Sequence, residues 1–238
     1  MTVNRSKDVV FIDLYGTLLH ERLDQVSVGD FLLRHDSPLP ESLHMTFWAE
    51  TGAHDHAVIS RSEDTYASAV RARRTELLVV HGASLPRAKA IVEEFEQWER
   101  TLSMEPYSEV LLTLEELGRM GLRRVVASNW HWDIDRVLAD SGVAELVDGV
   151  AGSGQIGYRK PNPAFYRAAL QIAGRPPEAC LFVGDNWYDD VEGPMRHDIA
   201  AVHLHRTSDS IHFIFHRGPE VTRVRRIATL DALVDLLS

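Results

Sequence analysis

The stretch VVFIDLYGTL, residues 9–18, ends an apolar run with an aspartate and a Gly-Thr turn. Its first four residues, 9–12, predict a short buried strand, and Asp13 follows where that strand ends. A carboxylate in that place can be an exposed and rigidly held nucleophile. Aspartate shortly before glycine at a strand end is also a common turn former, so this stretch alone leaves both interpretations open.

Short apolar runs with strand character recur along the chain, and stretches with helical periodicity lie between most of them. This alternation predicts an α/β fold with a parallel sheet covered on both faces. In such sheets ligands bind at the carboxyl ends of the strands. The further strands expected are 124–127, 149–151, 181–183 and 200–204, and the helices expected between them are 110–119, 134–140, 163–173 and 191–196.

The segment 20–104 breaks that alternation, because its pattern is typical of helices almost throughout. Ser62, followed by Glu63 and Asp64, is a candidate helix N-cap with acidic residues in the first turn. An all-helical insertion after the first strand predicts a separate lid over the active edge of the sheet, hinged near 20–23 and 104–106. The helices expected in the lid are 28–34, 43–50, 62–80 and 85–102.

The composition argues against several classes of protein. The chain has 35 acidic and 25 basic residues among 238, a formal charge of -10, which disfavours nucleic acid as a partner. The single cysteine, Cys180, cannot form an internal disulfide. No apolar run approaches the ~18 residues of a membrane span, and the first residues lack the pattern of a secretion signal. We therefore expect a cytoplasmic protein without a membrane partner, and the sequence does not predict its oligomeric state.

Side chains that can bind or react follow two of the later apolar runs. Ser128 and Asn129 come after the run 125–127, where neutral donors can hold a phosphate or carboxylate oxygen, although Ser-Asn is equally a helix cap. Lys160 lies in a loop just before an expected helix, and two prolines there fix the direction of its ammonium group.

Three acidic residues follow the run 181–183, at Asp185, Asp189 and Asp190. Carboxylates crowded at a strand end repel one another unless a cation lies among them, and hard oxygen ligands favour magnesium. The alternative is an aspartate-rich helix start that the helix dipole stabilises.

These four elements, in this order and at these strand ends, resemble the haloacid dehalogenase superfamily of hydrolases. The resemblance covers nearly the whole chain, and the helical segment matches the family's cap between its first two motifs. It implies a Rossmann-like, doubly wound parallel sheet formed by residues 1–19 and 105–238, with a helical cap domain at 20–104 inserted into it.

The resemblance also implies a mechanism. The family's first aspartate attacks the substrate and forms an aspartyl ester that water later hydrolyses. By position that nucleophile is Asp13, and Lys160 would offset the charge that builds when two anions meet. The groups expected to hold the substrate are Thr17, Ser128, Asn129 and Lys160. The ligands expected for Mg²⁺ are Asp13, the backbone carbonyl of Tyr15, Asp185, and Asp190 or Asp189.

Tyr15 departs from the phosphatase pattern. Family phosphatases usually place an aspartate there, which protonates the departing oxygen, and a phenol with a pKa near ~10 is a poor replacement. The alternatives are a substitute such as His20 or His131, a substrate with a good leaving group, a slow enzyme, or a different reaction.

The pattern Asp-x-Tyr-Gly-Thr-Leu is that of the family's 2-haloacid dehalogenases, which displace halide without a metal, and Tyr166 also fits their arrangement. Asp185 and Trp187, however, stand where those enzymes carry small polar residues, and an extra carboxylate would repel a carboxylate-bearing substrate. We therefore expect a Mg²⁺-dependent phosphatase that acts on a small phosphorylated metabolite through an aspartyl-phosphate intermediate. The alternatives are a 2-haloacid dehalogenase-type hydrolase and a non-catalytic relative that binds a phosphorylated ligand.

Overall fold

Six parallel strands form the central sheet in the computed structural model, which describes residues 7–22, 24–49, 55–206 and 224–238. The strand order is β5-β4-β1-β6-β7-β8, and every neighbouring pair is parallel. The strands are β1 (Val9–Ile12), β4 (Arg123–Ser128), β5 (Gly149–Gly152), β6 (Cys180–Gly184), β7 (Ala200–Leu204) and β8 (Arg225–Ile227).

Strand β1 lies in the interior of the sheet, between β4 and β6, and all four of its apolar residues are fully buried. Its last residue, Ile12, pairs with Val126 of β4 on one side and with Val183 of β6 on the other. The three strands therefore end close together, and the polar residues that follow them meet at one edge. The strands β4 and β5 lie on one side of β1, and the later strands β6, β7 and β8 lie on the other. The carboxyl edge beside β1 is therefore a topological switch point, where ligands bind in such sheets.

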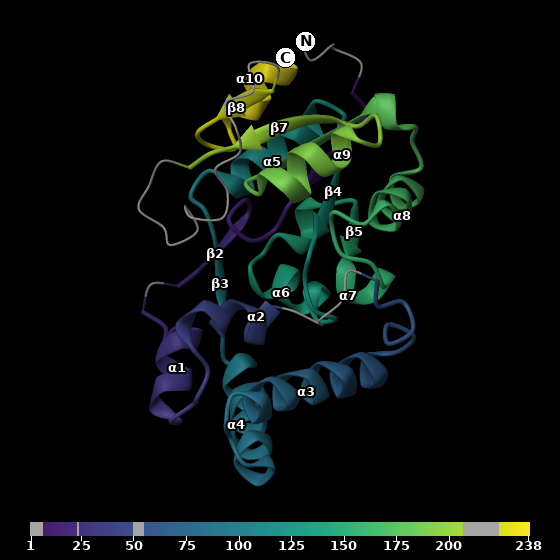
Figure 1. The fold of residues 1–238 in the computed structure, drawn as a ribbon. Coiled ribbons are helices and arrows are strands. Elements are labelled where there is room, and N and C mark those ends of the chain that lie inside the picture. The colour runs from purple at the N-terminus through teal and green to yellow at the C-terminus, as the bar shows by residue number, and fades with distance from the viewer. Residues whose placement is uncertain (1–6, 23, 50–54, 207–223) are drawn as a thin grey trace.

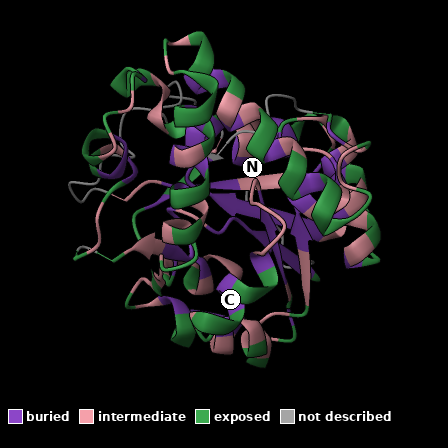
Figure 2. Ribbon diagram, turned by 90° about the horizontal axis from the view of Figure 1, so that it is seen from below, coloured by how far each residue is buried: buried purple, intermediate pink, exposed green. Residues whose placement is uncertain are grey.

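Helices cover both faces of the sheet, which confirms the doubly wound α/β fold predicted from the sequence. Alternate residues of a strand point to opposite faces. Val10 and Ile12 pack in one hydrophobic cluster with α5, α6 and α10, and Val9 and Phe11 pack in another with α8. Figure 2 shows the buried strands between helices with exposed outer surfaces. These helices are α5 (Val110–Arg119), α6 (Ile134–Asp140), α8 (Pro163–Ala173) and α10 (Ala232–Leu237).

Four helices between β2 and β3 pack around a hydrophobic cluster of their own. The buried ring of Phe95, for example, meets Phe31 and Phe47 edge-on, with centroids 5.2 and 4.9 Å apart. An antiparallel pair, β2 (Leu19–Glu21) and β3 (Met104–Pro106), connects these helices with the sheet, and Figure 1 shows them standing away from it beyond that pair. The four helices are α1 (Val28–Arg34), α2 (His44–Ala49), α3 (Glu63–Val80) and α4 (Leu85–Glu99).

One helix differs from its prediction. In place of a helix over 191–196, the chain forms a π-helical turn, η4 (Trp187–Glu192), followed by the short α9 (Gly193–Met195). The turn begins earlier because the side chain of Asn186 accepts hydrogen bonds from the amides of Tyr188 and Asp189.

Several short elements were not predicted, because three to six residues carry too little periodicity to be recognised. Leu23 and Glu50, which bounded an expected hinge and an expected helix, lie outside the described residues. None of the helices in the described part of the chain has the length and apolar character that crossing a bilayer requires. The elements not predicted are β2, β3, β8 and α10, with α7 (Ser153–Ile156), η1 (Glu41–Leu43), η2 (Ala144–Leu146) and η3 (Pro177–Ala179).

Candidate active site

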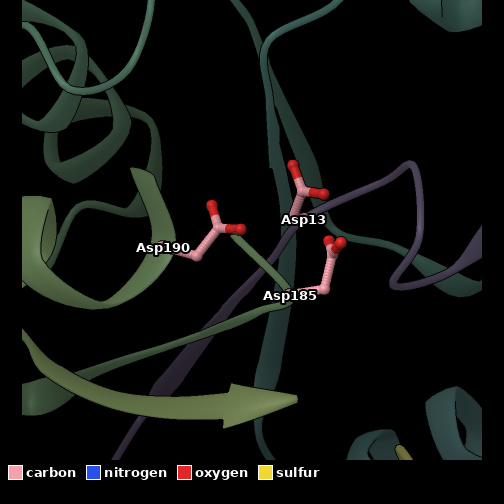
Figure 3. A group of neighbouring side chains, drawn as sticks. All are labelled: Asp13, Asp185 and Asp190. Atoms are coloured by element: carbon pink, nitrogen blue, oxygen red, sulfur yellow. The ribbon is translucent and has the colours of Figure 1, made fainter. Parts of the chain in front are cut away.

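Three carboxylates gather at the carboxyl end of the sheet. Asp13 follows β1, Asp185 follows β6, and Asp190 lies in η4. One oxygen from each lies within 4.8 Å of the others, and Figure 3 shows the three carboxyl groups side by side. Asp13 is 7% exposed, Asp185 9% and Asp190 0%, so the cluster is almost closed to water. Buried carboxylates this close repel one another strongly when ionised.

Lys160 supplies one cation to this cluster. Its Nζ donates to Oδ1 of Asp13 at 2.7 Å, to Oδ1 of Asp190 at 2.6 Å and to the carbonyl of Ala127 at 2.9 Å, so all three of its donors are used. Burial by itself lowers the pKa of Lys160, but the charges of Asp13 and Asp190 outweigh burial and raise that pKa above its usual value. Lys160 is therefore an ammonium ion at neutral pH.

The residue after Ser128 holds the Lys160 loop in place. The side-chain oxygen of Asn129 accepts from the amide of Lys160 at 2.7 Å, and its NH₂ group donates to the carbonyl of Lys160 at 3.1 Å and to Oδ2 of Asp189 at 3.2 Å. The next helix, α8, begins after Asn162, whose side chain accepts from the amide of Ala164. These bonds fix the backbone from which the ammonium group projects.

The two later carboxyl groups have raised pKa values. Burial raises the pKa of Asp185 to about 7, and the negative charge of Asp13 adds to the rise, while a hydrogen bond from Thr17 opposes it. Burial also raises the pKa of Asp190 well above its usual range, although the charge of Lys160 opposes the rise. If all three carboxyl groups are ionised, the one ammonium group leaves two negative charges uncompensated among these four side chains, and the raised pKa values show that the metal-free site disfavours that state.

The cluster fits a divalent cation. It offers carboxylate oxygens, the ligands that Mg²⁺ prefers, and the two charges that Lys160 leaves uncompensated when all three groups are ionised match the charge of that ion. Asp189 does not belong to the cluster, since its Oδ2 accepts from Asn129 and Asn186. Lys160 occupies Oδ1 of Asp13, and no hydrogen-bond donor from the described residues reaches Oδ2 of Asp13.

Thr17 and Ser128, two of the expected substrate-binding residues, lie at the same edge. Thr17 is fully buried and donates from its hydroxyl to Oδ1 of Asp185 at 3.1 Å. Ser128 is the last residue of β4 and is 2% exposed. Both lie where neutral donors for a substrate oxygen were expected, and their contact with a substrate stays a prediction.

Tyr15, two residues after Asp13, lies in an aromatic cluster. Its ring centroid is 5.6 Å from that of Trp48 in α2 and 6.3 Å from that of Trp130, and the two tryptophan rings are 6.1 Å apart. Burial, and then the charge of Glu21 and a hydrogen bond with its carboxyl, raise the pKa of the Tyr15 phenol. Tyr15 is therefore a neutral group at neutral pH and cannot act as a base. Glu21, at the end of β2, was not identified from the sequence because its stretch was interpreted only as a hinge.

The other residues considered from the sequence face elsewhere. His131 bonds the hydroxyl of Tyr66 and the carbonyl of Trp48, so both ring nitrogens contact the helical segment, and burial lowers its pKa. His20 bonds the carbonyl of Glu21. The hydroxyl of Tyr166 donates to the carbonyl of Asp189. Within the described residues, none of the three bonds a carboxyl group of the cluster.

A cavity of about 660 Å³ lies between the helical segment and the loop that follows β4. Trp48, Tyr66 and Arg74 line it from the helical side, and Trp130 and His131 line it from the sheet side. The cavity is not lined by the carboxylate cluster.

Residues 7–194, most of the chain, match the model of the family described as haloacid dehalogenase-like hydrolases. A phosphoserine phosphatase of Thermus thermophilus is 33% identical over 132 residues, which are 55% of this chain and 52% of that protein. The chain spans about half the length of the curated relatives it matches first.

Two solved structures share the fold over nearly the whole chain. An L-2-haloacid dehalogenase from Xanthobacter autotrophicus has a TM-score of 0.65 at 20% identity and covers 97% of this chain and 98% of its own. A HAD phosphatase from Thermococcus onnurineus has a TM-score of 0.60 at 19% identity and covers 97% of each chain. One is a dehalogenase and the other a phosphatase, so the shared fold does not choose between the two reactions.

Proposed function

This chain belongs to the haloacid dehalogenase-like hydrolases, and from that premise we propose that it is a Mg²⁺-dependent phosphatase of a small phosphorylated metabolite. The observation that carries the proposal is the nearly closed cluster of Asp13, Asp185 and Asp190, whose three carboxyl groups, when ionised, carry two more negative charges than Lys160 offsets. A hydrolase that displaced halide without a metal would gain nothing from this excess charge.

In the proposed reaction Oδ2 of Asp13 attacks the phosphorus atom. A bond forms between that oxygen and phosphorus, the bond to the leaving oxygen breaks, and water then cleaves the aspartyl phosphate to release phosphate. Lys160 holds Asp13 in place through Oδ1 and offsets charge as the two anions approach. When bound by Asp13, Asp185, Asp190 and the carbonyl of Tyr15, Mg²⁺ would neutralise the remaining charge of the site.

The neutral donors have different parts in this proposal. The hydroxyl groups of Thr17 and Ser128 would donate to the phosphoryl oxygens. The amide of Asn129 already bonds Lys160 and Asp189, so we propose that Asn129 also positions the Lys160 loop. The helical segment 20–104 would act as the cap that closes over the substrate.

The class of leaving group that the site favours can be inferred from Tyr15. Because the phenol is neutral and buried beside Glu21, it supplies neither a strong acid nor a base. A phosphate attached to a good leaving group, such as an acyl or aryl oxygen, needs no protonation to depart. We therefore propose acyl phosphates and aryl phosphates as better substrates than alkyl phosphates.

A substrate panel tests the phosphatase. The purified chain should release phosphate from some of these compounds with Mg²⁺ and not in chelator, and Asp13→Asn should lower the rate by at least about 10³-fold. Asp8→Asn is the matched control, since Asp8 is exposed and pairs only with Arg175 at the surface in the described structure. Phosphate release that survives Asp13→Asn, or no release from any ester, would refute the proposal.

The second candidate is a carbon-halogen hydrolase, and the observation that favours it is Tyr15 in the Asp-x-Tyr-Gly-Thr-Leu pattern. Halide release from 2-chloropropionate in the presence of chelator would support it. Against it stand Asp185, which adds charge to the site, and Tyr166, whose hydroxyl is bonded to the carbonyl of Asp189. A chain that binds phosphorylated ligands without Asp13-dependent turnover would be the non-catalytic relative.

A cytoplasmic location and the lack of nucleic-acid or membrane partners remain proposals that rest on composition. Fractionation of cells that express the chain tests the location.

A further inference from the structure

Arg206, just after β7, reaches back to the turn that follows the nucleophile. Its Nε donates to the carbonyl of Gly16 at 3.2 Å, and its Nη2 donates to the carbonyl of Thr17 at 2.8 Å. Its Nη1 lies 2.7 Å from Oε1 of Glu109, and the side chain is only 11% exposed. Each of the three guanidinium nitrogens therefore has a partner, and two partners are backbone carbonyls within four residues of Asp13.

The same turn contacts Asp185. Gly16 has a φ of +80°, and a Cβ at this position would lie 2.6 Å from Oδ2 of Asp185, so only glycine allows the turn to approach that carboxyl group. The hydroxyl of Thr17 donates to Oδ1 of Asp185. The turn therefore packs directly against the carboxyl group of Asp185, and its position limits where that side chain can lie.

Arg206 also contacts the chain where it returns from the helical segment. Its guanidinium carbon lies 3.6 Å from the ring centroid of Tyr107, which follows β3 directly. The amide of Tyr107 in turn donates to the carbonyl of Leu18 at 3.1 Å. One side chain thus holds the stretch before β2 and the stretch after β3, the two connections between the sheet and the helical segment.

An arginine suits this place and a lysine does not. The planar guanidinium group directs several N–H donors at once, so it can bond two carbonyls and a carboxylate in one plane. A lysine carries its three N–H donors on one nitrogen, so it does not reproduce the spacing of the three guanidinium nitrogens, each of which has its own partner here. A buried carbonyl left without a donor would bond water instead, and the Gly16–Thr17 turn would be less firmly held.

We propose that Arg206 is a positioning residue, which holds the Gly16–Thr17 turn and through it the placement of the Asp185 carboxyl group beside Asp13. It acts through backbone carbonyls and does not touch the substrate. This role goes beyond the proposed function, because it applies whichever group Asp13 attacks.

Hydrogen exchange tests the proposal without any turnover. The amides of Gly16, Leu18 and Leu19 are hydrogen-bonded within the turn, so their exchange reports its opening. In Arg206→Met these amides should exchange at least about tenfold faster than in the wild type, while those of β6 keep their rates. In Arg206→Lys the exchange rates of these amides should lie between those of the wild type and those of Arg206→Met. Arg175→Met, the same change at a side chain that is 52% exposed, should alter neither region.

Activity gives the second readout. With whichever substrate the wild type turns over, Arg206→Met should lower kcat by about 10²-fold, since a small misplacement of the reacting group has that effect. KM should change much less. Added guanidinium ion should restore part of kcat, because it can refill the site beside Glu109.

Unchanged exchange in the turn of Arg206→Met would overturn the proposal. Equally faster amide exchange in the turn and in β6 would also overturn it, because the substitution would then destabilise the whole core and not the turn in particular. If Arg206→Met fails to fold, Arg206→Lys decides by the same comparison of the turn with β6. A chain that hydrolyses no phosphate ester would refute the proposed function alone, since the exchange data would still test Arg206.

Discussion

The ammonium nitrogen of Lys160 lies 2.7 Å from Oδ1 of Asp13, and neither side chain is more than a tenth exposed. The same nitrogen bonds Asp190, so one cation from the loop before α8 bonds a carboxyl group that follows β1 and another within η4. Lys160 therefore connects the end of β1 with η4. It also makes the stability of the metal-free protein depend on a single positive charge.

Lys160→Met should destabilise the metal-free protein at neutral pH. The methionine keeps much of the volume but leaves the buried carboxylates of Asp13 and Asp190 without a counter-charge. We expect the free energy of unfolding to fall by about 3 kcal/mol, as for other buried pairs that lose one partner. Urea unfolding in chelator measures it. Lys89→Met, at an exposed position of α4, should stay within about 0.5 kcal/mol of the wild type.

The shifted pKa values of Asp185 and of His203, a residue of β7, make the stability of the protein depend on pH in opposite directions. The pKa of folded Asp185 is raised to about 7, above the unfolded value of about 3.9. Between these pH values the folded state binds more protons, so the contribution of Asp185 to the free energy of unfolding falls as pH rises, by up to about 4 kcal/mol. Burial lowers the pKa of His203 to about 4, so its contribution instead falls as pH drops from about 6.5 to 4.

The contribution of Asp185 is therefore isolated as the difference in the free energy of unfolding between the wild type and Asp185→Asn. In chelator, Asp185→Asn should be more stable than the wild type at pH 8, and the gap should narrow toward pH 4, because protonation removes the repulsion from the wild type. Added Mg²⁺ should stabilise the wild type more, since the carboxylate binds the ion better than the amide does. Urea unfolding at several pH values measures both effects. A gap that does not change with pH would show that Asp185 titrates normally.

The parts of the fold that the sequence predicted are those with local patterns. Strand β1 and helices α5, α6 and α8 have the predicted bounds, because an apolar run or a 3.6-residue period is visible within one segment. The strands β2 and β3 have three residues each and form only because the two connections of the helical segment pair with each other. No local pattern reports such a pairing.

In the candidate site, too, some features were predicted from local sequence patterns and others were not. Asp13 and Asp185 end strands that the sequence identified, and register then brings them together. The contact of Arg206 with Gly16 joins residues 190 positions apart, and the bond between Tyr15 and Glu21 depends on how β2 folds back. These contacts are fixed by tertiary packing, so a single sequence does not predict them.

Tyr15→Asp should change which leaving groups the enzyme tolerates. An aspartate there would supply the missing proton donor, so we expect kcat for an alkyl phosphate to rise by about 10²-fold relative to kcat for acetyl phosphate, whose leaving group needs no proton. Tyr15→Phe is the matched control. It keeps the ring beside Trp48 and Trp130 but loses the bond to Glu21, and it should leave that ratio unchanged. A simple loss of all activity in Tyr15→Asp, with halide release in the wild type, would favour the dehalogenase.

The ring of Trp48 should limit the size of the substrate. Trp48 and Trp130 contact Tyr15, two residues from Asp13, and both also line the cavity of about 660 Å³. The two tryptophan rings therefore lie between Tyr15 and that cavity. The carbonyl of Trp48 is held by Arg74 at 3.0 Å and by His131 at 2.8 Å, so its backbone has supports that do not depend on the side chain.

Shortening this side chain should join the cavity to the site. We expect Trp48→Leu to raise kcat/KM for 1-naphthyl phosphate relative to acetyl phosphate by at least about tenfold, because pocket contacts of this size discriminate to that extent. Both compounds have good leaving groups, so their ratio reports size. Trp132→Leu is the control, since Trp132 lines the same cavity but packs on Tyr66. An equal shift in both variants, or none in Trp48→Leu, would place the size limit elsewhere in the molecule.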